Sequence, residues 1–194
     1  HIHFVELANF RKLLATRIDI AKDSTVFVGA NNSGKTSAMV AMRRFLVDQR
    51  DFNINDFTLS LWPAINELGS AWETESEDVK PTDFDWGSIS PSLDVWLQVP
   101  DIQIYYVQGI LPTLDWDGSA IGVRLRYEPK NADDFKRDYL NARSATKKVM
   151  AAASGSDDSD DPFSLWPKSM IEFLSRRLRS TFEVKAYLLD PALL

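Results

Sequence analysis

Apolar and polar residues alternate in several parts of the chain, and this alternation predicts β-strands that contribute side chains to a core from one face. The pattern is clearest at residues 93–99, where Leu93, Val95 and Leu97 fall on one face before Pro100 ends the run. We expect a half-exposed strand here, paired antiparallel with residues 123–127, which show the same pattern. Further strands are expected at residues 2–7, 16–20 and 182–188.

A continuous apolar run predicts one more strand, and the periodicity then changes to that of a helix. Residues 24–28 read Ser-Thr-Val-Phe-Val and lead directly into Gly29, which is typical of a buried strand. After Lys35, apolar residues recur at Ala38, Met42 and Phe45, spaced by four and three. The sequence therefore predicts strand, turn and helix in immediate succession.

The remaining segments divide into helices and loops. Helical spacing predicts helices at residues 133–150 and 167–179, and residues 102–111 favour a short helix. Residues 9–12 and 116–119 are interpreted as turns. Acidic residues, Ser, Gly and two prolines indicate a surface loop at residues 66–91, and residues 154–162 read as a flexible acidic linker.

The turn between the predicted strand and helix carries the most specific motif in the chain. Gly29-Ala30-Asn31-Asn32-Ser33-Gly34-Lys35-Thr36 fits the pattern G-x-x-x-x-G-K-[ST]. The glycines permit a backbone whose N–H groups converge on an anion, and the dipole of the following helix reinforces that preference. Lys35 is expected to contact the β- and γ-phosphates of ATP and Thr36 to bind Mg²⁺, while Ser37 is placed near the α-phosphate.

Composition limits the other possibilities. The 194 residues suffice for one domain, 44% are hydrophobic, and the net charge is −6. There is no cysteine and no apolar run of about 20 residues, so we expect a cytoplasmic protein without a membrane span. The two histidines, His1 and His3, lie at the start of the chain, which argues against histidine-based catalysis in a cleft.

The loop and an upstream turn together resemble the RecF, SMC and OLD group of ABC-type ATPases. The similar residues are Val-Phe-Val-Gly-Ala-Asn-Asn-Ser-Gly-Lys-Thr-Ser and, before them, Glu6-Leu7-Ala8-Asn9-Phe10-Arg11-Lys12. The resemblance implies that Arg11 reaches the bound nucleotide. It implies the same, less firmly, for Lys12.

A longer match resembles the bacterial OLD-family ATP-dependent endonucleases. It comprises residues 111–118, residues 123–129 and Tyr139-Leu140-Asn141-Ala142-Arg143. In that family an N-terminal ABC ATPase is coupled to a C-terminal Toprim nuclease, and several members act against phage. The resemblance therefore implies homo-oligomers formed through ATPase heads, DNA as a ligand of the full assembly, and a second protein subunit as a possible partner.

Several parts of a complete ABC ATPase have no clear counterpart in the sequence. The strand that should end in Asp-Glu is approached only at Asp190, where Pro191 replaces the glutamate, so a turn after a strand is the preferred interpretation. No Leu-Ser-Gly-Gly signature and no Toprim acidic cluster are found. The acidic run at residues 157–161 is interpreted as a linker, and Gln98, Gln103 and Gln108 remain equal candidates for the glutamine that contacts Mg²⁺.

The predicted fold is α/β: an incomplete P-loop ATPase head of ABC/SMC type with an antiparallel β-subdomain and helical insertions. Residues 1–50 would form the P-loop core, 51–130 the loop and β-subdomain, 131–180 the helical region and linker, and 181–194 a final strand. The predicted function is ATP binding and hydrolysis by a dimerised head that controls DNA cleavage. A RecF- or SMC-like repair ATPase without nuclease and a non-hydrolysing assembly module remain alternatives, and a small-molecule kinase is weaker because no arginine-rich lid is found.

Overall fold

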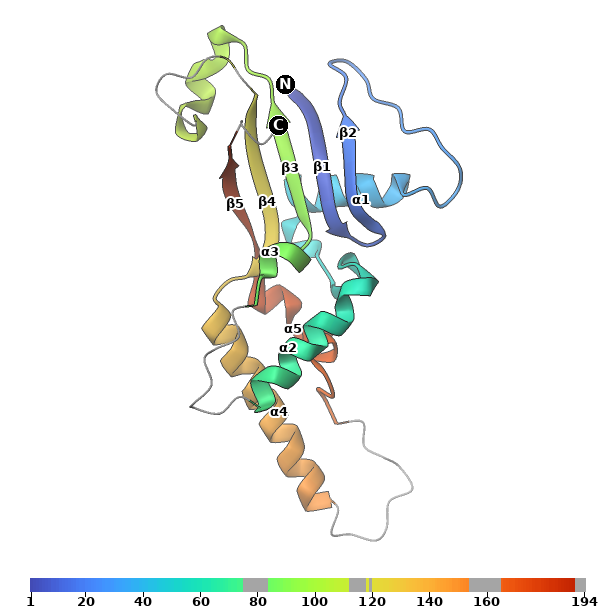
Figure 1. Cartoon of the computed structure of the whole chain (residues 1–194), viewed down its shortest axis with the longest axis vertical. Coiled ribbons are helices and arrows are strands. Elements are labelled where there is room, and N and C mark those ends of the chain that lie inside the picture. Colours follow the sequence, from blue (N-terminus) through green and yellow to red (C-terminus); the bar gives the residue numbers. More distant parts are fainter. Residues whose placement is uncertain (75–83, 112–117, 119, 154–164, 191–194) are drawn as a thin grey trace.

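A five-stranded sheet forms the upper half of the molecule in the computed structural model, which describes residues 1–74, 84–111, 118, 120–153 and 165–190 (Figure 1). Its spatial order is β2-β1-β3-β4-β5, and every neighbouring pair is antiparallel. The strands are β1 (Ile2–Phe10), β2 (Leu13–Asp19), β3 (Ser92–Leu97), β4 (Ile121–Pro129) and β5 (Phe182–Leu189).

The helices lie in two places relative to this sheet. Helix α1 (Lys35–Leu46) crosses one face of the sheet, while α2, α4 and α5 gather beyond one end of the strands (Figure 1). The other α-helices are α2 (Trp62–Thr74), α3 (Trp86–Ile89), α4 (Ala132–Ala153) and α5 (Met170–Thr181). Short 3₁₀ helices are η1 (Gln49–Asp51), η2 (Ile54–Asp56), η3 (Leu59–Leu61) and η4 (Asp101–Ile110).

An aromatic cluster joins the sheet to the helical half. The ring of Tyr127 on β4 stacks on Phe52 with a centroid distance of 4.1 Å, and Phe45 of α1 contacts Phe52 edge-on at 5.0 Å. The ring centroid of Phe182, at the start of β5, lies 5.4 Å from that of Phe135 of α4. All five side chains are buried. Burial also raises the pKa of the Tyr127 phenol, which remains neutral within this core.

Most of the predicted elements are confirmed. The strands expected at residues 2–7, 16–20, 93–99, 123–127 and 182–188 correspond to β1, β2, β3, β4 and β5, and the antiparallel pairing of β3 with β4 is as predicted. Helices are present at the three expected places after Lys35, although the last begins at Met170 instead of Pro167. Ser169 caps that helix, its hydroxyl accepting from the Glu172 amide. Residues 102–111 are helical as expected, but of 3₁₀ type.

The prediction that β3 is half exposed was wrong. Ser92, Asp94 and Trp96, on the face opposite Leu93, are buried. Long side chains of the neighbouring strands cover them: Arg124 forms two hydrogen bonds with Asp94, and Phe4 stacks on Trp96. A central strand can therefore be enclosed by its neighbours without a second layer of helices.

The prediction of a surface loop over residues 66–91 was also wrong for most of its described part. Residues 66–74 belong to α2, and residues 86–89 form α3. The core residues of α2 are Ile65, Leu68, Gly69 and Trp72, which follow a helical spacing. Gly69 is a contact point, because a Cβ there would lie 2.8 Å from the Tyr139 hydroxyl.

Residues 24–28, predicted as a buried strand, form neither a helix nor a strand. Val26 and Val28 are 76% and 87% exposed, and Phe27 alone among them packs against the core. A strand requires a hydrogen-bonding neighbour, and none of the strands in the described part of the chain pairs with this run. The predicted linker at residues 154–162 and all but Gly118 of the turn at 116–119 lie outside the described residues.

Candidate nucleotide-binding site

The glycine-rich loop leads directly into the N-terminus of α1. Gly34 precedes the first helical residue, Lys35, and has φ of +100°, a backbone conformation that favours glycine. A Cβ at this position would lie 2.9 Å from Cδ2 of Leu13, so the close approach of β2 also requires glycine. Asn32 adopts a positive φ of 69° as well. The predicted start of the helix at Lys35 is confirmed.

The side chain of Lys35 folds back over the loop. Its Nζ donates to the carbonyl oxygens of Gly29 and Ala30, each at 2.6 Å, and to the Ser33 hydroxyl at 3.2 Å. None of the ion pairs among the described residues involves Lys35. Among the described residues, no carboxylate therefore competes with an incoming anion for this ammonium group.

The turn between β1 and β2 places two further cations beside the loop. Arg11 has a positive φ of 54°, and its Nε and Nη2 each lie 2.9 Å from Oδ1 of the fully buried Asp56. Lys12 Nζ contacts the main-chain carbonyl and the side-chain oxygen of Asn32. The turn is therefore tied both to the loop and to the segment that follows α1.

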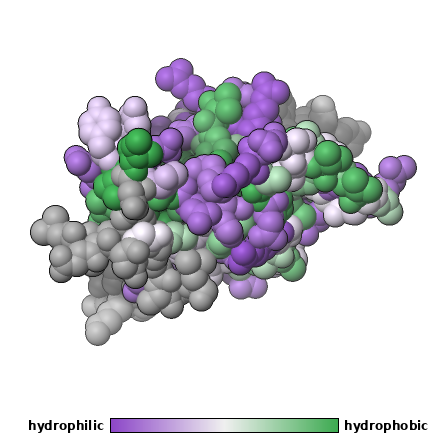
Figure 2. All heavy atoms as spheres, turned by 90° about the horizontal axis from the view of Figure 1, so that it is seen from above, coloured by the Kyte–Doolittle hydropathy of each residue, from purple (hydrophilic) through white to green (hydrophobic). Residues whose placement is uncertain are grey.

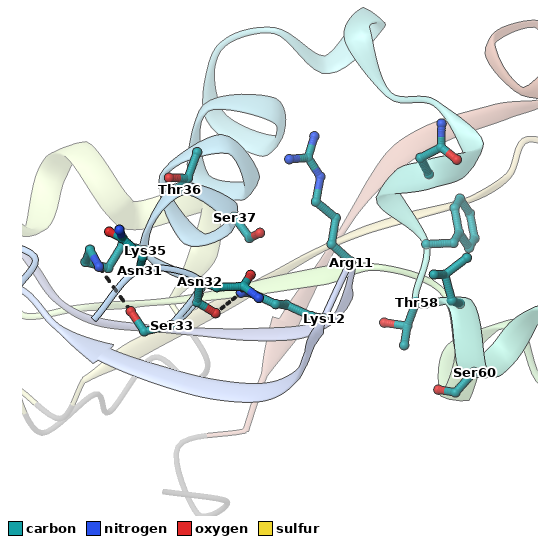
Figure 3. A pocket seen from close by; sticks show the side chains of 14 residues that line it. Arg11, Lys12, Asn31, Asn32, Ser33, Lys35, Thr36, Ser37, Thr58 and Ser60 are labelled. Carbon is teal, nitrogen blue, oxygen red and sulfur yellow. Dashed lines mark hydrogen bonds between the residues drawn. The ribbon is translucent and has the colours of Figure 1, made fainter. Parts of the chain in front are cut away.

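These elements enclose one cavity of about 770 Å³, a volume typical of small-molecule sites (Figure 3). Most of the predicted site residues line it, and Gly29 contributes through the contact of its carbonyl with Lys35. The predicted residues in the lining are Arg11, Asn31, Asn32, Ser33, Gly34, Lys35, Thr36 and Ser37, together with the less firmly predicted Lys12.

The opposite wall of the cavity was missed by sequence reasoning. It consists of residues that follow α1 in sequence and belong to no motif: Asn55, Phe57, Thr58, Leu59 and Ser60. Only tertiary contacts place this segment at the site. Arg11 N donates to the carbonyl of Asp56 at 2.9 Å, and Phe10 forms a β-bridge with Phe57. These two contacts bring the segment next to the predicted arginine.

Every charged side chain that lines the cavity within the described part of the chain is cationic: Arg11, Lys12 and Lys35. The cavity thus suits a multiply charged anion. Thr36 is exposed in the same cavity, and its hydroxyl oxygen is a donor of the kind that Mg²⁺ prefers. The residues present therefore fit a magnesium-bound polyphosphate, with Thr36 as the protein ligand.

Other candidates for the site are not brought to the cavity. Gln98, Gln103 and Gln108 are absent from its lining, and so is Asp190, which follows β5. Within the described ranges, no group of three or more histidine and acidic residues could hold a metal ion. The acidic run at residues 157–161 lies outside those ranges.

The geometry above is that of an anion-binding loop at a helix N-terminus. The chain belongs to the AAA ATPase domain family, whose model matches residues 1–190. No curated protein matches the chain. In the described ranges, no helix has the length and apolarity needed to cross a membrane.

One similar solved structure comes from work described as "Structural biochemistry of ATP-driven dimerization and DNA stimulated activation of SMC ATPases". It shares 18% sequence identity with this chain, with a TM-score of 0.35. The similarity covers 65% of this chain and 62% of that one. This chain therefore corresponds to less than two thirds of the length of its neighbour.

Proposed function

We propose that this chain is the nucleotide-binding part of an ATPase head of the ABC and SMC type, in which residues 29–37 hold ATP with Mg²⁺. The observation that carries the proposal is the single cavity that brings the loop, Lys35, Thr36 and Arg11 together. Membership of the AAA ATPase domain family supports the same nucleotide.

Each residue has a definite task in this proposal. The loop amides and the N-terminus of α1 bind the phosphates, and Lys35 neutralises the charge of the β- and γ-phosphates. Arg11 adds a second cation from the β1–β2 turn. Thr36 would hold the magnesium ion, which would supply Lewis-acid polarisation of the phosphoryl oxygens. Together these groups orient the γ-phosphate for in-line attack by water.

Hydrolysis also needs a group that orients the attacking water. No carboxylate lines the cavity in the described part of the chain. We therefore expect this chain to bind ATP but to hydrolyse it slowly. The missing carboxylate would come from another segment of the head or from a partner subunit across an ATP-linked interface.

The larger setting that we propose is an OLD-family protein in the cytoplasm. ATP would join two heads and thereby control a nuclease domain that cuts DNA, in defence against phage. The resemblance of residues 111–118 and 123–129 to that family supports this setting. A Toprim domain in the full-length gene would separate it from a RecF- or SMC-like repair ATPase.

The absence of a carboxylate from the described lining also favours a second candidate. In a non-hydrolysing assembly module, ATP would hold subunits together without turnover. Measuring turnover by the full-length protein beside its Lys35→Ala variant distinguishes the two. The assembly module would be favoured if neither protein hydrolyses ATP and ATP still holds the wild-type complex together.

Calorimetric titration with Mg·ATP tests the binding site itself. Lys35→Ala removes the main cation from the phosphate site, so we expect about 10-fold or greater loss of affinity, the value of a charged hydrogen bond. Lys148→Ala, an exposed lysine of α4, is the matched control and should bind like the wild type. Equal affinity in all three proteins would refute the proposal.

A further inference from the structure

The wall opposite the P-loop differs from it in charge. The P-loop and the β1–β2 turn contribute every charged side chain of the described lining, all of them cationic. The opposite wall, residues 55–60, contributes only neutral groups to the lining: an amide, two hydroxyls, an aromatic ring and an apolar side chain. This division matches a nucleoside triphosphate, whose charge is confined to its phosphates.

The wall is held in place independently of any ligand. Asp56 binds Arg11 through both its carboxylate and its main-chain carbonyl, and Asn53 and Asp56 form a capping box around η2. Phe57 is fully buried and pairs with Phe10. Thr58, the next residue, therefore has a fixed position relative to the β1–β2 turn.

Thr58 carries an unused polar group at this position. The residue is 5% exposed, yet its hydroxyl has no hydrogen-bond partner among the residues that the structure describes. Thr58 is the N-cap of η3, where a threonine hydroxyl usually accepts from a backbone amide, but its side chain makes no such bond. A buried hydroxyl without a partner is costly, which points to a partner from outside the described part of the chain, such as a bound ligand.

The arrangement of the cavity indicates where that partner lies. Figure 3 shows Arg11 and Lys12 between the P-loop residues and Thr58, whose hydroxyl oxygen is turned towards them. A nucleotide with its phosphates on the P-loop would extend across these cations, so its ribose would reach Thr58 first. Leu59, 68% exposed and also in the lining, then offers an apolar surface for the base.

We propose that residues Asn55–Ser60 form the nucleoside-binding wall of the site, and that the Thr58 hydroxyl hydrogen-bonds a ribose hydroxyl of the bound nucleoside triphosphate. This inference rests on the proposed function, because it assumes that the phosphates occupy the P-loop. It assigns a specificity-determining role to a residue outside the motif: Thr58 distinguishes ribonucleotides from deoxyribonucleotides.

The test compares four probes by titration calorimetry: Mg·ATP, Mg·2′-deoxy-ATP, Mg·3′-deoxy-ATP and Mg·tripolyphosphate. The wild type should bind at least one deoxynucleotide about 2- to 10-fold more weakly than ATP, the value of one neutral hydrogen bond. Thr58→Val should abolish that preference and leave tripolyphosphate binding unchanged. Thr58→Ser, which keeps the hydroxyl, should retain the preference.

A second variant guards against a folding defect in Thr58→Val. Leu59 is exposed, so Leu59→Ser should fold normally, weaken ATP binding and leave tripolyphosphate binding unchanged. Wild-type discrimination in Thr58→Val, or no ribose preference in the wild type, would overturn the inference. If the wild type binds neither Mg·ATP nor Mg·tripolyphosphate more tightly than Lys35→Ala does, the proposed function itself is refuted.

Discussion

At the scale of single residues, Asp56 links the candidate site to the core. Its carboxylate is fully buried, with Arg11 on one oxygen and the Asn53 amide, at 3.1 Å, on the other. Nε of Arg44 lies 3.6 Å from the same second oxygen, an ion pair too long for a hydrogen bond. One acid therefore balances an arginine of the β1–β2 turn and one of α1.

Asp56→Asn removes this charge without changing the shape of the side chain. Two arginines then lack a buried counter-charge, so we expect the free energy of unfolding to fall by about 3 kcal/mol or more, measured by urea denaturation. Asp51→Asn is the control, because Asp51 pairs with the same Arg44 at 2.8 Å but is 57% exposed. That change should cost less than about 1 kcal/mol. Equal losses in the two variants would contradict the assignment.

Gly34→Ala tests the loop geometry. The substitution places a Cβ at positive φ and against Leu13, so we expect a loss of about 1–3 kcal/mol of stability and weaker Mg·ATP binding. Gly109→Ala is the matched control, because nothing lies within 4 Å of its added Cβ. Its stability should stay within about 0.5 kcal/mol of the wild type in thermal denaturation. A neutral Gly34→Ala would show that the loop adapts.

The site residues also show which parts of the site can be predicted from the sequence. The P-loop residues could be located because the motif fixes their chemistry in a short, local stretch, whereas Arg11 was expected only from the resemblance of its turn to the ATPase group. Thr58 could not be predicted, since its place in the site depends on Arg11 contacting Asp56 across 45 sequence positions. Nothing in the local sequence distinguishes the Thr58 hydroxyl from any surface threonine.

At the scale of elements, an ion cluster fixes α2 against α4. Glu73 accepts from Arg143 at 2.6 and 3.1 Å and from the Tyr139 hydroxyl at 2.7 Å, and Lys147 lies 2.8 Å away. Burial alone would raise the pKa of the Glu73 carboxyl, but these hydrogen bonds outweigh it and lower the pKa to about 2. Burial and the Glu73 contact together raise the pKa of the Tyr139 phenol.

The lowered pKa makes this contribution to stability dependent on pH. A carboxyl with a lower pKa in the folded state stabilises the fold above its unfolded value of 4.5, and this stabilisation is lost as the pH falls towards about 2. Glu73→Gln should lower the free energy of unfolding at pH 7 by about 2–3 kcal/mol. The difference in the free energy of unfolding between this variant and the wild type should narrow between pH 4.5 and 2. Urea denaturation at a series of pH values measures it.

Glu67→Gln provides the comparison on the same helix. Glu67 is exposed, so this variant should match the wild type at every pH within about 0.5 kcal/mol. A constant difference between Glu73→Gln and the wild type across the acid range would mean that packing, and not the carboxylate charge, stabilises the contact of α2 with α4.

Element predictions succeeded where one face of a segment meets the core and failed where tertiary contacts decide burial. α4 buries Phe135, Tyr139 and Thr146 on one side, and it was predicted within a few residues. β3 was placed correctly but its exposure was not, because side chains such as Arg124 from neighbouring strands cover its second face. α2 was missed because Gly69 makes room for Tyr139, a neighbour 70 residues later in the chain.

At the scale of the whole molecule, apolar residues remain exposed before the P-loop and along α1. They belong to the segment before the loop, to α1 and to the residue that follows α1: Val26, Val28, Met39, Leu46 and Val47. Figure 2, a view from above, shows hydrophobic surface on the side where the segment between β2 and α1 lies in Figure 1. Exposed apolar surface of this kind is typical of an interface. It suits the further part of the ATPase head that we propose, packed against α1.

Hydrogen exchange tests this interpretation of residues 24–28. None of the backbone hydrogen bonds of the described ranges is donated by their amides, whereas β1 is paired on both sides, with β2 and β3. In this chain we therefore expect the amides of residues 24–28 to exchange with opening free energies near zero, and those of β1 to be strongly protected. If the proposed head includes a further strand beside this run, residues 24–28 should be protected in the full-length protein as well, because pairing engages their N–H groups. Protection of residues 24–28 in this chain alone, or its absence from the full-length protein, would show that this apolar run is not an unpaired strand of the head.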